Sequence, residues 1–150
     1  MGRKRKVVNS LVEATGEENL FPSSEHLEQA AFFEWIEFAS KREPRLSAAF
    51  AIPNGAHLAR GAITFSTLRK EGFRTGIPDV FIPIPNDGYH GLFLEFKYGK
   101  NKQTSTQAAW QEALSQLGYC VRIPYSCEEA IKQVKQYLRW GTRDISLGII

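Results

Sequence analysis

The spacing of apolar residues changes along the chain, and each spacing predicts a different kind of element. A helical spacing runs from Ser23 and Ser24, which are good N-cap residues, to about Ser40. Pro44, in the segment KREPRLS, then breaks this helix. The apolar stripe of the helix is predicted to contain Leu27, Ala31, Trp35 and Phe38.

Short apolar segments in the middle of the chain predict strands. AAFAIPNG is expected to form a short strand closed by an Asn-Gly turn. A second helix is expected from about Ala56 to Lys70, with Gly72 as its C-terminal stop. GIPDVFIPIP is predicted to form a strand that PNDG turns back into the strand HGLFLEFK. Pro83 and Pro85 indicate that the first of these two strands is frayed in its later half or lies at a sheet edge.

The last part of the chain carries two helix-start signals on either side of a strand. Thr104 and Gln107 have capping-box spacing and open a helix that Gly118 is expected to end. YCVRIPY is predicted to be a strand, and Ser126 with Glu129 has the spacing of a second capping box. The order helix, strand, helix, hairpin, helix, strand, helix predicts an α/β fold with a small mixed β-sheet flanked by helices.

Length and composition agree with one globular domain. The chain has 150 residues, of which 43% are hydrophobic and 23% are charged, and a mass of 17.0 kDa. We expect a flexible basic and polar N-terminal arm over residues 1–22, the globular domain over 23–140, and a C-terminal tail over 141–150.

Three further features bear on the compartment. No apolar run approaches the roughly 20 residues that a membrane-spanning helix needs, so no membrane association is expected. The basic start MGRKRKVVNS is not followed by the apolar region of a secretory signal. Cys120 and Cys127 are too few for a disulfide framework, and their spacing fits no zinc site. These observations predict a cytoplasmic, reduced environment.

The segment LFLEFK places a glutamate and a lysine inside an otherwise apolar strand. Because side chains alternate across a strand, Glu95 and Lys97 share one face. A hairpin would bring Asp79, at the start of the preceding strand, next to them. Two converging carboxylates repel unless a cation neutralises them, and Mg²⁺ prefers oxygen ligands. The cluster therefore suggests metal-assisted phosphodiester hydrolysis, and a plain cross-strand salt bridge of Lys97 with one acid is the alternative.

These residues resemble a known nuclease core. Pro78-Asp79, followed by Glu95-Phe96-Lys97, is similar to the signature of the PD-(D/E)XK nucleases. The wider pattern resembles the VRR-NUC branch of that superfamily, from about Glu25 to Leu138. The segments that carry this resemblance are AIPNG at 51–55, EGFRTGIPDVFIPIP at 71–85, YHGLFLEFK at 89–97 and TQAAWQEALSQLGYCVRI at 106–123.

The resemblance implies a restriction-endonuclease-like core over 23–140 and Mg²⁺- or Mn²⁺-dependent cleavage of DNA, often of branched substrates such as Holliday junctions. It makes Asp79 and Glu95 metal ligands, together with the backbone carbonyl of Phe96. It assigns to Lys97 the orientation or activation of the attacking water. Compact stand-alone nucleases of this kind are typical of phages, so a phage-encoded protein in a bacterial host is also implied.

Two more residues enter the predicted catalytic site through the resemblance. Gln107 matches a glutamine on the helix after the core, although its capping-box role is a sufficient structural explanation. The family also places an acid on the first helix, where Glu25 and Glu28 are available. Glu25 is favoured because Gln29 follows it at the E-x-x-x-Q spacing. A solvated glutamate that interacts with the helix dipole is the alternative.

DNA is the predicted partner, and its phosphates are the predicted contacts. The net charge of +3 is mild, but basic residues are clustered, and no base-reading motif is recognisable. A non-catalytic DNA-binding module and a protein-interaction domain are the rival interpretations. A four-way junction needs two symmetric cuts, so a homodimer is expected. Apolar residues that would serve its interface are Phe32, Phe33, Ile36 and the segment ISLGII. The alternative is that these residues complete the core of a monomer.

Overall fold

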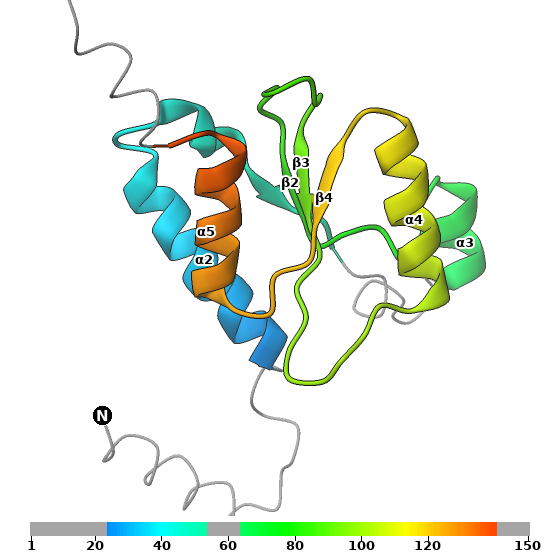
Figure 1. Ribbon diagram of the computed structural model, residues 1–150. Coiled ribbons are helices and arrows are strands. Elements are labelled where there is room, and N and C mark those ends of the chain that lie inside the picture. Colours follow the sequence, from blue (N-terminus) through cyan, green and yellow to red (C-terminus); the bar gives the residue numbers. More distant parts are fainter. Residues whose placement is uncertain (1–23, 54–63, 141–150) are drawn as a thin grey trace, which may run out of the picture.

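The computed structural model describes residues 24–53 and 64–140 of the chain (Figure 1). Its elements follow the predicted order, with one additional short 3-10 helix. They are α2 (Ser24–Ala39), η1 (Pro44–Ala48), β1 (Phe50–Ala51), α3 (Phe65–Lys70), β2 (Val80–Ile82), β3 (Leu92–Leu94), α4 (Ser105–Gln116), β4 (Cys120–Arg122) and α5 (Cys127–Tyr137). Within these residues, no helix is long and apolar enough to cross a membrane.

The four strands form one mixed sheet in the order β1-β2-β3-β4. β1 and β2 pair antiparallel, as do β2 and β3, whereas β3 and β4 pair parallel. The register places Val80 opposite Leu94, and Leu94 beside Arg122. Helices lie on both sides of the sheet, with α2 and α5 on one side and α3 and α4 on the other (Figure 1). The predicted fold class, α/β with a small mixed sheet flanked by helices, is confirmed.

The core lies between the sheet and the pair α2 and α5. α2 packs against α5, and the ring of Phe32 lies 5.7 Å from that of Phe96, centroid to centroid. The largest fully buried side chains come from the helix pair, the strands and the segments beside them. They are Phe32, Phe96, Leu46, Ile82, Leu92, Leu94, Val80, Val134 and Pro124.

The predicted apolar stripe of the first helix is wrong except at Trp35, which packs against the core. Leu27 and Phe38 are 55% and 72% exposed, whereas Phe32 and Ile36 are buried. The helix carries apolar residues at helical spacing on more than one face, so the pattern alone does not choose between them. The face that packs on the sheet is the one from which Phe32 reaches Phe96. Since Phe32 and Ile36 complete the core of one chain, they do not support a dimer interface.

Two boundaries also differ from expectation. Thr64 is extended, and its side chain accepts a hydrogen bond from the Thr67 amide, so it is the N-cap of α3. A single helix over 56–70 is therefore wrong at Thr64, and most of that range, with the Asn-Gly turn, lies outside the described residues. Prolines are well tolerated at the first turn of a helix, and Pro44 begins η1, which the sequence did not predict.

The hairpin between β2 and β3 has the expected turn. Asp87 and Gly88 have φ values of 52° and 83°, the left-handed conformations that a tight two-residue hairpin turn requires. β2 ends at Ile82, before the first proline, so the later half of the predicted strand is frayed. It is not an edge strand, because β1 and β3 pair on either side of it.

Both predicted helix caps at 104 and 126 exist, but only one is a complete capping box. Thr104 and Gln107 exchange the two reciprocal hydrogen bonds. Ser126 accepts from the Glu129 amide, whereas the Glu129 carboxylate accepts from the Tyr125 amide at 2.9 Å. The predicted reciprocal bond to Ser126 is therefore replaced by one to the preceding residue. The arm over 1–22 and the tail over 141–150 lie outside the described residues.

Candidate active site

The candidate site is built on the chain immediately after β3. Regular pairing ends at Leu94, but the Glu95 amide donates to the Arg122 carbonyl at 2.9 Å and the Lys97 amide to the Pro124 carbonyl at 3.0 Å. Parallel pairing with the β4 side thus continues through this segment. Phe96 belongs to the hydrophobic core, and Glu95 and Lys97, which alternate with it, do not. The local backbone therefore presents both charged side chains on the face opposite the core.

Asp79 joins this pair from the neighbouring strand, as the hairpin predicts. It directly precedes β2, and its Oδ2 accepts a hydrogen bond from the Phe96 amide at 2.8 Å. The Asp79 carboxylate is therefore held against the backbone between Glu95 and Lys97. The predicted backbone ligand, Phe96, lies at this contact.

Glu95, Lys97 and Gln107 form a hydrogen-bonded triad in which the two charged residues are buried and Gln107 is half-buried. The Lys97 ammonium Nζ lies 3.0 Å from Glu95 Oε1 and donates to Gln107 Oε1 at 3.0 Å. Gln107 Nε2 in turn donates to Glu95 Oε1. Glu95 is 2% exposed and Lys97 is 7% exposed. Burying two charges is costly unless they are paired, so this arrangement is an unusual one for a small domain.

Gln107 makes two sets of contacts at once. Its Oε1 also accepts from the Thr104 amide at 2.9 Å, and its own amide donates to Thr104 Oγ1 at 3.2 Å. The side chain that completes the capping box of α4 is thus the one that contacts Lys97 and Glu95. One rotamer of Gln107 therefore makes the capping-box bonds and the contacts with Lys97 and Glu95, and its role in a site stays a prediction.

Close packing places the start of α4 beside the segment that leads into β2. Gly76 has a φ of +81°, and a Cβ there would come within 2.6 Å of Thr106 Cγ2. The Trp110 indole Nε1 donates to the Thr75 carbonyl at 2.9 Å. These two contacts dock α4 on the segment that carries Asp79, and so place Gln107 and Asp79 at one site.

The two carboxylates are destabilised as anions in the metal-free chain. Burial raises the pKa of Asp79, against the opposing effects of the Phe96 amide and the Lys97 charge. Burial, followed by the charge of Asp79, raises the pKa of Glu95 to about 7, although Lys97 opposes the rise. Glu95 Oε2 is also buried without a hydrogen-bond partner among the described residues. A buried carboxylate oxygen without a partner, close to a second carboxylate, fits a hard divalent cation.

Glu25 lies near these carboxylates, but its hydrogen-bond partner is outside the triad. Its charge raises the pKa of both Asp79 and Glu95, and its Oε1 accepts from Asn101 Nδ2 at 3.0 Å. Glu28 instead accepts from the Cys127 amide at the start of α5. The structure therefore places Glu25, and not Glu28, toward the site. In the described part of the chain, no three or more His, Cys, Asp or Glu residues are grouped as a metal site.

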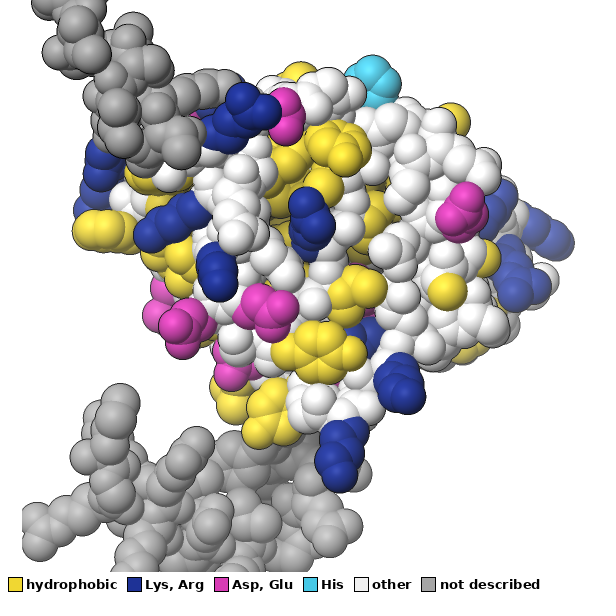
Figure 2. All heavy atoms as spheres, viewed as in Figure 1, with side chains coloured by type: hydrophobic (Ala, Val, Ile, Leu, Met, Phe, Trp, Pro, Cys, Tyr) yellow, Lys and Arg dark blue, Asp and Glu magenta, His cyan; other side chains and the backbone are white. Residues whose placement is uncertain are grey.

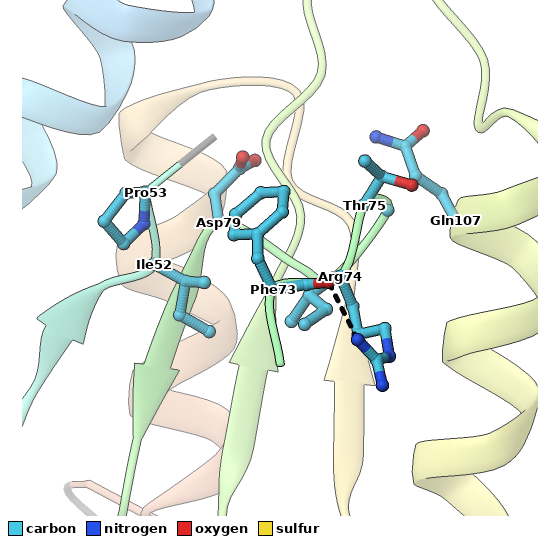
Figure 3. Close-up of a pocket in the computed structure, with 9 residues that line it drawn as sticks. Ile52, Pro53, Phe73, Arg74, Thr75, Asp79 and Gln107 are labelled. Atoms are coloured by element: carbon cyan, nitrogen blue, oxygen red, sulfur yellow. Dashed lines mark hydrogen bonds between the residues drawn. The ribbon is translucent and has the colours of Figure 1, made fainter. Parts of the chain in front are cut away.

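A small cleft of about 50 Å³ opens beside Asp79 and Gln107. Ile52, Pro53 and residues 73–77 complete its lining. The Asp79 carboxylate and the Gln107 amide lie toward one end of this view, and the Arg74 guanidinium is directed the other way (Figure 3). Arg74 Nη1 donates to the carbonyls of Arg69 and Phe73. Arg74 therefore belongs to the outer wall and not to the carboxylate end.

Sequence reasoning missed Asn101 and the Gly76 contact. The hydrogen bond between Asn101 and Glu25 joins residues 76 positions apart, and no local pattern predicts such a contact. The glycine of GIPD was a usable signal, because glycine is the residue favoured where the backbone has a positive φ or another segment approaches closely. Asn54, Gly55 and Arg60, considered in the sequence as a phosphate-binding turn, lie outside the described residues.

Comparison with known proteins agrees with the fold. No protein-family profile and no curated protein matches the sequence. A solved structure described as a "VRR_NUC domain protein" is similar to this chain, with a TM-score of 0.62 and 26% sequence identity. The similarity covers 81% of this chain and 93% of that one. The chain therefore has a nuclease-like α/β domain. Its fold is that of a VRR-NUC domain.

Proposed function

We propose that this protein is a Mg²⁺- or Mn²⁺-dependent deoxyribonuclease of the PD-(D/E)XK type that hydrolyses phosphodiester bonds in branched DNA. The observation that carries the proposal is the convergence of Asp79, Glu95, Lys97 and Gln107 at one partly buried site. The fold of a VRR-NUC domain supports the same reaction class.

The donor set fits the proposed metal. Asp79 and Glu95 supply carboxylate oxygens, one of which, Glu95 Oε2, has no partner in the described residues. The Phe96 carbonyl would add a third oxygen from the backbone that Asp79 contacts. When bound, a divalent cation makes a water more acidic and offsets negative charge on the phosphate. It would also oppose the burial and the repulsion by Asp79 that together raise the pKa of Glu95.

The remaining side chains would position a charge and keep it fixed. Glu95 and Gln107 hold the Lys97 ammonium at 3.0 Å on two sides, so its location does not depend on the substrate. A preorganised cation at such a point stabilises the extra negative charge of the phosphodiester transition state. Gln107, itself fixed by the cap of α4, acts as a positioning residue for both Glu95 and Lys97.

The substrate assignment is the finer part of the proposal. Phosphate contacts by lysine and arginine would bind DNA independently of sequence. A four-way junction requires two symmetric cuts, and a two-fold dimer would supply two sites. The structure offers one such site per chain within the described residues.

A cleavage assay tests the proposal. The full chain is incubated with a four-way junction, a flap and a plain duplex in Mg²⁺, Mn²⁺ or EDTA. Cleavage should require the metal and should be lost in Asp79→Asn and in Glu95→Gln, while both variants still bind DNA. Asp87→Asn is the matched control, because Asp87 is an exposed acid in the hairpin turn, at the other end of β2. Cleavage by either site variant at the wild-type rate contradicts the assignment, and DNA binding without cleavage in any metal favours the non-catalytic module.

A further inference from the structure

Two half-exposed tyrosines directly follow the paired segments after β3 and β4. Tyr98 directly follows Lys97, and Tyr125 directly follows Pro124, the residue whose carbonyl accepts the Lys97 amide. Tyr98 is 49% exposed and Tyr125 is 40% exposed. Both tyrosines therefore lie at the end of the paired segments that carry the candidate active site, and this pairing fixes where they emerge.

The loop after Tyr98 is held in place by side-chain hydrogen bonds. The Asn101 amide donates to the Tyr98 carbonyl at 3.0 Å, which closes a tight turn through Gly99. The Tyr125 hydroxyl donates to the Asn101 carbonyl at 3.0 Å, and Asn101 Nδ2 donates to Glu25. Asn101 thus connects Tyr125 with the acid whose charge acts on Asp79 and Glu95.

The same loop carries exposed positive charge. Lys100 and Lys102 flank Asn101, and both are exposed. Figure 2 shows hydrophobic side chains and lysine or arginine side chains next to each other in the lower part of this face. Among the described residues, no hydrogen bond or ring contact engages the Tyr98 side chain, so its ring is available to a ligand.

Aromatic rings interleaved with lysines match the chemistry of a single strand of nucleic acid. Bases stack on the rings, and the lysines pair with the phosphates between them. Bases inside a duplex are already stacked on each other, so only an unpaired nucleotide offers a free face. A peptide partner that is apolar would explain the rings, and an acidic one would explain the lysines, but neither explains both kinds of side chain together at this loop.

We propose that Tyr98 and Tyr125, with Lys100 and Lys102, form a binding site for an unpaired DNA strand beside the active site. This inference rests on the proposed nuclease function and adds the substrate feature that the site selects. Stacking of unpaired bases on these tyrosines places the adjoining phosphodiester next to Lys97. The chain would then favour DNA with a flap, gap or open branch point over continuous duplex.

A binding assay without cleavage tests this site separately from the catalytic assignment. Fluorescence anisotropy in EDTA measures the affinity of the full chain for an oligothymidine of about 12 nucleotides, a length typical of single-strand sites. A second oligomer of equal length has the same phosphates but abasic sugars. Wild type should bind the oligothymidine roughly tenfold more tightly, because stacking needs the base.

The variants should then separate rings from charges. Tyr98→Ala and Tyr125→Ala should bind both oligomers with nearly equal affinity. Lys100→Ala and Lys102→Ala should instead weaken the binding of both oligomers by the same factor and reduce its salt dependence. Tyr125→Phe keeps the ring and should keep the preference. Tyr89→Ala is the matched control, because Tyr89 is 41% exposed and lies in the hairpin turn at the opposite end of the sheet. Lys41→Ala is the matched control for the two lysine variants, because Lys41 is exposed.

Each outcome has a definite meaning. If the tyrosine variants bind like wild type while their circular dichroism melts are unchanged, the stacking site is wrong even if the enzyme cuts DNA. Equal binding of the oligothymidine and the abasic oligomer by wild type also overturns it. A protein that never cleaves but loses base-dependent binding in these variants retains the site and contradicts only the nuclease function.

Discussion

A Cβ atom at Gly76 would approach Thr106 Cγ2 to 2.6 Å, so the backbone before β2 and the first turn of α4 touch with no room for a side chain. Gly76 lies three residues before Asp79, and Thr106 lies one residue before Gln107. Asp79 and Gln107 contribute to the candidate site from these two segments. The close approach of α4 to the segment that carries Asp79 therefore depends on the absence of a side chain at Gly76.

Gly76→Ala should be more destabilising than Gly72→Ala. Both glycines have a left-handed φ, but only Gly76 has a neighbour within 4 Å of the added Cβ. Gly72→Ala should cost about 1–2 kcal/mol through backbone strain, and Gly76→Ala about 1–3 kcal/mol more through overpacking. Urea unfolding measures the difference. Cleavage should fall only in the Gly76 variant, and equal stability of the two variants contradicts the close contact.

Gln107→Ala should impair both stability and cleavage. Loss of the capping partner should cost roughly 1 kcal/mol, and loss of the amide leaves Lys97 and Glu95 less well positioned. Gln107→Glu can still complete the capping box, but it puts a carboxylate where Glu95 now meets an amide donor. It should therefore be inactive with its helix cap retained. Thermal melts and single-turnover cleavage separate the two effects, and full activity of the Ala variant would refute a site role.

Stability of the metal-free chain should decrease across the titration range of Glu95. Its folded pKa of about 7 lies above the ordinary value of 4.5, so the folded state binds the proton more tightly than the unfolded state. The free energy of unfolding then falls as pH rises through this window, by up to roughly 3 kcal/mol. Glu95→Gln removes the titration. Its Tm advantage over wild type, measured in EDTA, should grow from pH 4.5 to pH 7, and a constant difference contradicts the buried carboxylate.

Lys97→Ala should lower kcat and leave DNA affinity nearly unchanged. The ammonium is 7% exposed and fixed by Glu95 and Gln107, so it is poorly placed for long-range attraction of DNA. Loss of a preorganised charge of this kind typically costs roughly 10²–10³ in rate. Lys41→Ala, at an exposed lysine after α2, is the control. Unchanged turnover with weaker binding would make Lys97 a phosphate contact only.

The proposed dimer should appear as a mass twice the 17.0 kDa of one chain. Two active sites related by a two-fold axis would cut opposite strands of a four-way junction. Light scattering at micromolar concentration measures the mass, and paired junction cuts, compared with cuts in plain duplex, measure the preference. A monomeric mass together with equal cleavage of junction and duplex would remove the dimer.

Local spacing was sufficient for several features of the fold and the site. The capping box of Thr104 and Gln107 depends on residues three apart, and the hairpin turn depends on Asp87 and Gly88. Because a hairpin pairs the start of one strand with the end of the next, the approach of Asp79 to Glu95 and Lys97 could also be anticipated. The chemical roles of these residues remain predictions.

The remaining features depend on partners that are distant in the sequence. Phe32 and Phe38 are both apolar residues of α2. Only the packing of Phe32 on Phe96 shows which of the two lies on the buried face of the helix. The link from Asn101 to Glu25 and the contact of Gly76 with Thr106 likewise exist only after the elements have assembled. No periodicity within one segment contains that information.

The continuation of parallel pairing past β3 separates two parts of the protein that are under different structural constraints. Glu95 and Lys97 are attached to backbone that is paired and buried, so few substitutions there are tolerated. One residue later, at Tyr98, the chain becomes an exposed loop that returns to the fold at Thr104. Under the proposed nuclease function, exchange of that loop should change the DNA preference while Glu95 and Lys97 stay in register. The junction between Lys97 and Tyr98 is thus the natural point for a loop exchange on this scaffold.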